Sequence, residues 1–191
     1  MNRNLLKNFN KIWLGAVAVN LMLLAFLPDW FSRESISGFL EGLGALALVT
    51  YIFVSLARAL LFLPITPFII AGEITFPDMP VILWVISTLG VVVGAFIVYS
   101  FPSLGGYDKF LEENYPKAVD YLKRKLLGRY AFWIIAGWAF FPAVPTDAVC
   151  YVSGIAKYPF RKMLLPLLIG ELPIVTAYIF LGAEIGEWLR L

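Results

Sequence analysis

YAFWIIAGWAFFPAVPTDAVCYVSGIAK, residues 130–157, decides the fold because it is almost entirely apolar yet is interrupted in its middle by FPAVPTD. Pro142 and Pro145 lack backbone donors and disfavour helical backbone in the residue that precedes each. We therefore expect a helix that enters this stretch to end near Phe141. Each arm has about a dozen residues with about 1.5 Å of rise each, too short to cross a hydrocarbon core of about 30 Å. The stretch predicts a re-entrant hairpin with Asp147 beside its break.

Composition indicates an integral membrane protein. Hydrophobic residues make up 61% of the 191 residues and charged residues 15%, whereas soluble proteins average about 25% charged residues. The net charge of +2 gives no reason to expect nucleic-acid binding. With no histidine and Cys150 as the one cysteine, a disulfide pair, a His-based metal site and a Ser-His or Cys-His catalytic pair are excluded within one chain. We expect no enzyme activity and no cofactor, although an acid-only metal site or hydrolase stays open.

The first predicted region, residues 1–42, comprises a basic N-terminal segment, a transmembrane helix over residues 12–28 and a short outer segment. The residues ahead of that helix include three basic residues and no acid, so the N-terminus is expected to be cytoplasmic. No small-residue cleavage site follows, and we expect the helix to be retained. The outer segment carries Arg33, Glu34 and Glu41.

Residues 43–101 form the second region, which resembles the opening stretch in its plan. Arg58 is the only charge ahead of a second Pro-x-x-Pro motif, Pro64 and Pro67. An uncharged run over residues 81–101 follows and is long enough to span a bilayer. The region therefore predicts a proline-broken hairpin followed by one span.

Polarity changes in residues 102–129, where lysines and arginines alternate with acids. Apolar residues recur there at helical spacing: Tyr115, Val119, Leu122 and Leu126. We expect an amphipathic helix at the cytoplasmic interface. Residues 130–182 then hold the hairpin described above and a last span over residues 164–182, and residues 183–191 are a short tail. Residues 43–182 together would form one domain.

The distribution of basic residues predicts how the two hairpins enter the membrane. Basic residues flank residues 130–155 on both sides, so both ends of that hairpin are expected on the cytoplasmic face. The first hairpin must then enter from the outside. The result is an inverted repeat of two broken hairpins, an arrangement that places a substrate site near the bilayer midplane in transporters. Glycines that would let helices pack closely are Gly90, Gly94, Gly154, Gly170 and Gly182.

Two blocks of sequence resemble a known family. FPAVPTDAVCYVSGIAKYPFRKMLLPLLIGELPIVTAYIFLG is similar to the second half of the VTT domain, the SNARE-associated Golgi protein family that includes the bacterial DedA proteins, and LPITPFIIAGEITFP is similar to its first half. Residues that match the family pattern are Pro142, Pro145, Asp147, Tyr151 and Gly154. Ala139 and Cys150 depart from it, since the family often has arginine and asparagine there. The resemblance implies two opposed re-entrant helices and movement of phospholipids or polyprenyl-phosphate carriers between leaflets.

Four charged residues and one tyrosine are the candidates for a substrate or proton path, together with the two Pro-x-x-Pro motifs. These residues are Arg58, Glu73, Asp147, Tyr151 and Glu171. An acid at the centre of a membrane helix costs about 2.5–3.5 kcal/mol, so a deep acid is expected to have a role. Asp147 could equally cap the outgoing arm, Glu73 could lie at the outer interface, and Glu171 could be a structural partner of Arg58. Arg58 could also contact a headgroup phosphate or snorkel toward the interface.

We therefore expect an all-helical membrane protein that translocates lipids between leaflets. Its partners would be phospholipid or polyprenyl-phosphate headgroups, with a coupling proton and a homo-oligomer left open. The plasma (inner) membrane is the expected location. Two alternatives stay open: a proton- or ion-coupled transporter of a small solute, and a membrane assembly or scaffold protein that transports nothing.

Overall fold

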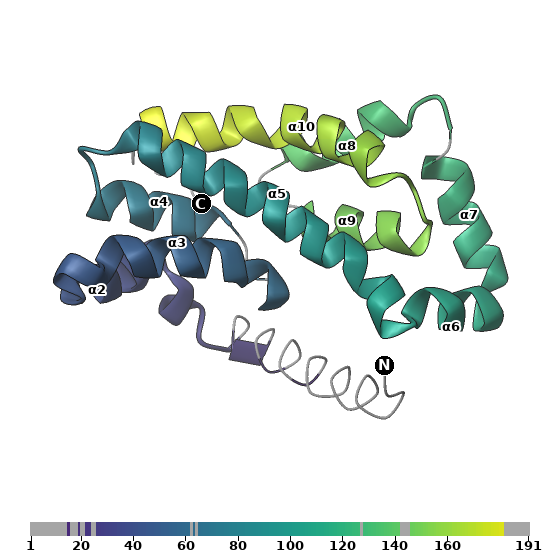
Figure 1. The fold of residues 1–191 in the computed structure, drawn as a ribbon, viewed down its shortest axis with the longest axis horizontal. Helices are drawn as coiled ribbons and strands as arrows, with labels where there is room; N and C mark the ends of the chain where they lie inside the picture. Colours follow the sequence, from purple (N-terminus) through teal and green to yellow (C-terminus); the bar gives the residue numbers. More distant parts are fainter. Residues whose placement is uncertain are drawn as a thin grey trace.

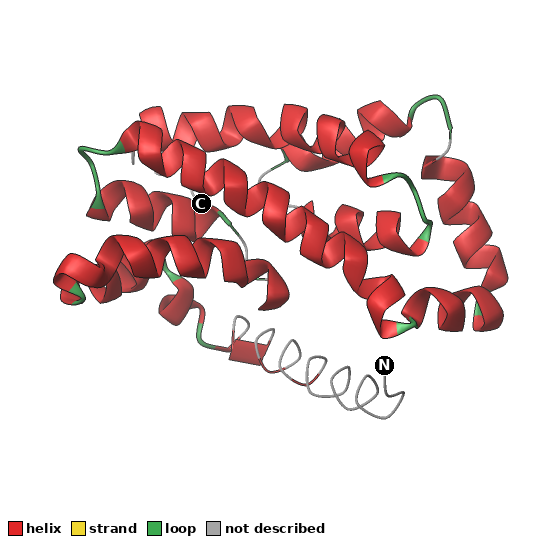
Figure 2. Cartoon of the chain, in the orientation of Figure 1, coloured by secondary structure: helices red, strands yellow, loops and turns green. Residues whose placement is uncertain are grey.

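The computed structural model describes residues 15, 19, 22–23, 26–61, 63, 65–126, 128–141 and 146–181. Within these residues every regular element is a helix and no strand occurs, so the all-helical fold is confirmed (Figure 2). Pro64, Pro142, Pro145, Gly182, the tail and most of the predicted first span lie outside the described residues.

Twelve elements follow one another along the described residues. They are η1 (Pro28–Phe31), α2 (Arg33–Gly42), η2 (Gly44–Leu46), α3 (Ala47–Ala57), η3 (Arg58–Leu61), α4 (Thr66–Thr75), α5 (Pro80–Gly105), α6 (Tyr107–Asn114), α7 (Pro116–Leu126), α8 (Ala131–Phe140), α9 (Thr146–Ile155) and α10 (Phe160–Phe180).

Two long helices, α5 and α10, form the centre of the molecule (Figure 1). Their 26 and 21 residues correspond to lengths of about 39 and 31 Å, enough to cross a hydrocarbon core of about 30 Å. α5 starts with Pro80 in its first turn and ends at Gly105, and the next residue, Gly106, has a φ of 73° that favours glycine. In the described part of the chain, these are the two candidate spans, or three if α2 and the segment Gly44–Ala57, bent by 119°, are counted as one.

Two pairs of short helices, α3 with α4 and α8 with α9, pack around the long helices. α8 ends at Phe140, and Phe141 has extended backbone with φ of −89° and ψ of 111° ahead of the first proline. The helix end expected near Phe141 is therefore confirmed. In Figure 1 the pair α3 and α4 and the pair α8 and α9 lie toward opposite ends of the molecule.

In each pair of short helices, one helix packs against one long helix and the other helix packs against the other long helix. α3 packs along α5 and α8 along α10, whereas α4 packs against α10 and α9 against α5. Glycines allow the close approaches: a Cβ at Gly94 would lie 2.9 Å from that of Ala59, and one at Gly154 would overlap the Tyr99 carbonyl oxygen. Gly170 likewise lies against the Ala136 carbonyl oxygen. The re-entrant inverted repeat stays a prediction.

The polar segment after α5 differs from the single amphipathic helix that the pattern predicted. It forms two helices, α6 and α7, because Gly106 ends α5 in the left-handed region and the Tyr115–Pro116 bond interrupts the helix that follows. Val119 and Leu126 of α7 are buried. Tyr115, expected on the same apolar face, lies outside α7 and is 58% exposed.

Candidate functional site

Three charged side chains from distant parts of the sequence meet in the interior. Arg58 begins η3, Asp147 lies in the first turn of α9, and Glu171 lies in the middle of α10. The Arg58 Nη1 atom is 4.0 Å from Asp147 Oδ2. Arg58, Asp147 and Glu171 are only 5%, 8% and 5% exposed. We refer to these three residues as the buried charge cluster.

Neighbouring atoms fix this cluster at the two helix breaks. Arg58 Nη1 donates a hydrogen bond of 2.8 Å to the carbonyl oxygen of Leu63, just ahead of the first Pro-x-x-Pro motif. Thr146 Oγ1 donates to Glu171 Oε1 at 3.4 Å, just after the second motif. The two breaks therefore converge on one site, and Glu171, about 16 Å along α10 from Phe160, brings the middle of a long helix into it.

The breaks also explain why these charges are tolerated where they are. Arg58 lies at the C-terminal end of α3, where a cation interacts favourably with the helix dipole. Asp147 lies at the N-terminal end of α9, where an anion does so. A continuous helix through the first motif would remove the helix end that stabilises Arg58, and one through the second motif would remove the end that stabilises Asp147. Each charge would then lie against apolar side chains without that stabilisation.

The cluster carries unequal numbers of opposite charges. One guanidinium faces two carboxyl groups, which leaves a net charge of −1 when all three are ionised. Its surroundings are apolar, since Ala59, Val149 and Leu167 belong to one buried hydrophobic core. An unbalanced charge in such surroundings is costly. The site is therefore suited to accept a proton or another cation.

Comparison with protein families identifies the domain that contains Asp147 and Glu171 of this site. The family model of the VTT domain matches residues 63–184, which is more than half of the chain. The chain belongs to the VTT domain family. The resemblance to the SNARE-associated Golgi and DedA proteins is thus confirmed. Comparisons with curated proteins and with solved structures gave no match.

Three other predicted path residues are described by the structure, and none of them is part of the cluster. Pro67 is in the first turn of α4, and Tyr151 is half-buried in α9 against the core. Glu73 is half-buried in the last turn of α4, about 10 Å along the helix from Thr66. The fold therefore brings Arg58, which precedes the matched residues 63–184, together with Asp147 and Glu171 of the VTT domain, whereas Glu73 lies apart from them.

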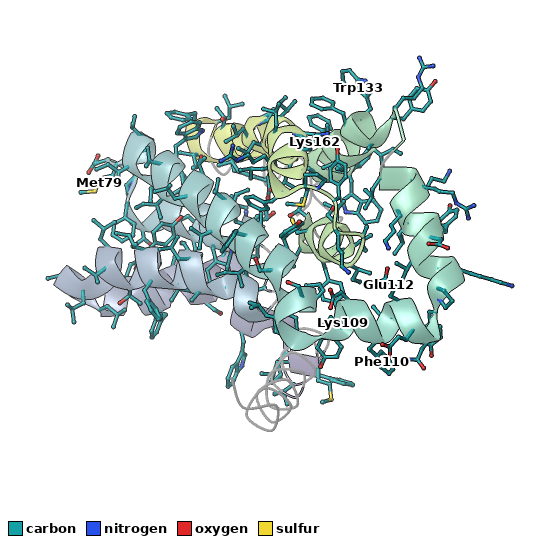
Figure 3. The ribbon with its side chains drawn as sticks, turned by 45° about the vertical axis from the view of Figure 1, so that its right-hand side comes forward. Met79, Lys109, Phe110, Glu112, Trp133 and Lys162 are labelled. Atoms are coloured by element: carbon teal, nitrogen blue, oxygen red, sulfur yellow. The ribbon has the colours of Figure 1, made fainter. Side chains whose placement is uncertain are left out.

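A second charged network lies at the end of the VTT domain that holds α6 and α7. Lys157 Nζ is 3.7 Å from Asp108 Oδ2 and 3.4 Å from Glu112 Oε2, and Lys123 Nζ is 2.7 Å from Glu112 Oε1. Figure 3 shows Glu112 on the side of α6 that faces α7 and α9. We refer to these four residues as the surface charge network. It ties α6, α7 and the α9–α10 turn together.

The surface charge network shifts the titration of its members. Hydrogen bonds from Lys123 and then Lys157 lower the pKa of Glu112, and the bond to Glu112 raises the pKa of Lys123. Lys157 adopts a φ of 54°, in the left-handed region that non-glycine residues rarely occupy. Sequence reasoning missed this network because partners such as Lys157 and Glu112 lie 45 positions apart. The left-handed backbone at Lys157 could not be predicted either, because glycine, the residue that usually marks such a conformation, is absent from that position.

The described part of the VTT domain offers no recognisable metal site. No group of three or more His, Cys, Asp and Glu side chains is arranged there to hold an ion. Cys150, the one cysteine, is buried in the core next to the charge cluster.

Proposed function

We propose that this VTT-domain membrane protein translocates lipids between the two leaflets of its membrane. The observation that carries the proposal is the buried charge cluster, located where two helix breaks meet beside the midpoints of two long apolar helices. Charged residues at membrane depth are costly and usually mark a substrate or ion path. A lipid headgroup is the polar group that every membrane presents to such a path.

The lipid phosphate would bind to Arg58. A guanidinium offers planar donors that match phosphate oxygens. The first turns of α4 and α9 lie at the two breaks, so their helix dipoles would add to the attraction for an anion. Phospholipids and polyprenyl-phosphate carriers share this phosphate chemistry, and the acyl or prenyl chains would stay in the hydrocarbon layer.

The two acids of the cluster would bind the positive charge that accompanies the phosphate, either a proton or a headgroup amine. With one cation against two carboxyl groups, Asp147 and Glu171 can take up a proton or orient a headgroup amine while Arg58 holds the phosphate. A zwitterionic headgroup supplies both charges at once. The net charge of the site then stays close to constant as the headgroup passes.

Charge distribution suggests how the protein is placed in the membrane. Most basic residues of the described chain, Arg33 and Arg58 excepted, gather at the end of the molecule that holds α6, α7 and the start of α10, away from Met79 (Figure 3). They include Lys109, Lys123, Arg124, Lys125, Arg129, Lys157, Arg161 and Lys162. By the positive-inside rule we assign this end to the cytoplasm, with a plasma (inner) membrane location.

The excess acid also favours a second candidate, a transporter of a small solute coupled to protons or other ions. Such a transporter could use the same cluster as its ion site. It would move solute in response to a pH gradient whatever the lipid composition. A lipid translocase would exchange labelled lipid in vesicles that contain no solute.

Leaflet exchange of a headgroup-labelled phospholipid tests the proposal. The purified protein is placed in liposomes and compared with protein-free vesicles, with Asp147→Asn, and with Glu113→Gln as a control at an exposed acid of α6. We expect exchange above background, reduced about tenfold in Asp147→Asn, equivalent to about 1.4 kcal/mol in the barrier. Glu113→Gln should match the wild type. Folded protein that exchanges neither phospholipid nor polyprenyl phosphate would contradict the proposal.

A further inference from the structure

A groove lined mainly by apolar side chains lies on the other side of Leu63 from the buried charge cluster. Its volume is about 260 Å³, and it is enclosed by η1, α2, α3, α4 and the break between the last two. Its lining includes Trp30, Phe39, Leu40, Val54, Leu63 and Phe68. None of the cluster's three charged side chains lines it.

The groove has a buried floor and an exposed mouth. Leu40, Leu63 and Phe68 are 2%, 7% and 6% exposed, whereas Trp30 and Phe39 are 68% and 61% exposed. The mouth therefore consists of large aromatic side chains on the outside of the molecule, and the floor reaches into the core. This shape differs from the exposed apolar surface that any membrane helix presents to lipid.

The size and chemistry of the groove select its occupant. Cavities with apolar walls do not hold water. A second helix is too wide, since a cylinder about 10 Å across that filled this volume would be only about 3 Å long, less than one helical turn. The volume corresponds to about nine water-sized groups. A single unbranched hydrocarbon chain fits that description, and lipid chains are what surrounds this part of the protein.

Leu63 connects the groove to the charge cluster. Its side chain lines the groove floor, and its carbonyl oxygen accepts the hydrogen bond from Arg58 at 2.8 Å. An apolar site and a buried cation are thus separated by one residue. A molecule that occupied both would need a hydrocarbon chain joined to an anion, which is the composition of a phospholipid.

We infer that the groove between α2, α3 and α4 holds one acyl chain of a phospholipid whose phosphate binds Arg58. This inference rests on the proposed function and adds a second half to its site. Because the membrane is already apolar, the groove gains little from hydrophobic transfer. Its contribution is positional: a chain held against Leu63 keeps the phosphate next to the guanidinium.

Photolabelling tests the inference without a transport assay. Wild-type protein in phosphatidylcholine vesicles is irradiated with a phospholipid that carries a photoreactive group on one acyl chain, and labelled residues are mapped by mass spectrometry. A diacylglycerol with the same chains but no phosphate serves as the matched probe. We expect the phospholipid to label groove residues about tenfold more than the diacylglycerol does, and both probes to label the exposed face of α5 around Leu89 equally.

A variant pair sharpens the same experiment. Val54→Trp should fill the groove and reduce its labelling about tenfold, while Leu89→Trp, at a residue that is 53% exposed on α5, should leave it unchanged. Equal groove labelling by the two wild-type probes, or labelling no stronger than at Leu89, would overturn the inference even if Val54→Trp failed to fold. Leaflet exchange without groove labelling would reject the groove alone. Groove labelling without exchange would reject the proposed translocation.

Discussion

The buried charge cluster and the surface charge network are built from the same kinds of residues but differ in charge balance. In the surface charge network, the exposed Lys157 and the half-buried Lys123 face Glu112 and the buried Asp108, two cations against two acids. In the interior, one arginine faces two acids. The imbalance thus occurs where solvent cannot screen it, because Arg58 is 5% exposed and the Lys157 side chain is 54% exposed.

This difference separates a structural role from a functional one. An ion network that only holds helices together is most stable when its charges cancel, as on the surface. Burial of an uncompensated acid is costly, so a fold selected for stability alone would have an apolar residue at one of the two acid positions. We therefore interpret the buried cluster as a site that handles charge and the surface network as a structural tie.

The largest effect should come from removing the cation of the buried cluster. Arg58→Gln leaves two acids facing each other with no positive partner, and we expect it to lower stability by about 3–5 kcal/mol. Thermal unfolding of the purified protein in detergent measures this loss. Lys123→Gln is the control, because its Nζ is in the surface network and contacts Glu112. Equal unfolding temperatures for the two variants would show that burial makes no difference.

A second change distinguishes lost charge balance from lost packing. Adding Asp147→Asn to Arg58→Gln removes the acid that lies within 4.0 Å of the guanidinium. If repulsion between buried acids causes the instability, the double variant should recover part of the unfolding temperature. A double variant less stable than Arg58→Gln would indicate that packing of these side chains decides the effect.

A smaller effect on stability is expected when the pH is lowered, and it should arise in the surface charge network. Hydrogen bonds from Lys123 and Lys157 place the pKa of Glu112 below its ordinary value of about 4.3. A lowered pKa contributes stability above the unfolded value, and that contribution is lost as pH falls through the folded value. Amide hydrogen exchange of α6 and α7 should therefore rise below about pH 4, and Glu112→Gln should show raised exchange already at pH 7.

Salt provides the matching control for this surface effect. The Glu112 pairs are exposed to solvent, so high salt should weaken them and bring wild type and Glu112→Gln closer together. The exposed Glu113→Gln variant should exchange as the wild type does. Wild-type α6 and α7 that exchange equally at pH 3 and pH 7, after correction for intrinsic rates, would show that the network does not hold them.

Much of the helical organisation follows from local signals in the sequence. Proline chemistry predicts the end of α8 near Phe141, an uncharged run predicts α5, and an apolar run interrupted only by Glu171 predicts α10. Local patterns could not predict which distant groups meet. Arg58 was weighed as a partner for Glu171, whereas its ion pair is with Asp147, 89 positions away. That contact depends on how two broken hairpins pack, which no residue periodicity encodes.

The central claim is tested most directly by measuring leaflet exchange in two variants, one with an acid replaced in the buried charge cluster and one with an acid replaced in the surface charge network. Glu171→Gln and Glu112→Gln make the same chemical change, once in the buried cluster and once at the surface. The account predicts that Glu171→Gln slows phospholipid exchange about tenfold in folded protein, while Glu112→Gln exchanges as the wild type does. Equal rates for the two variants would contradict it.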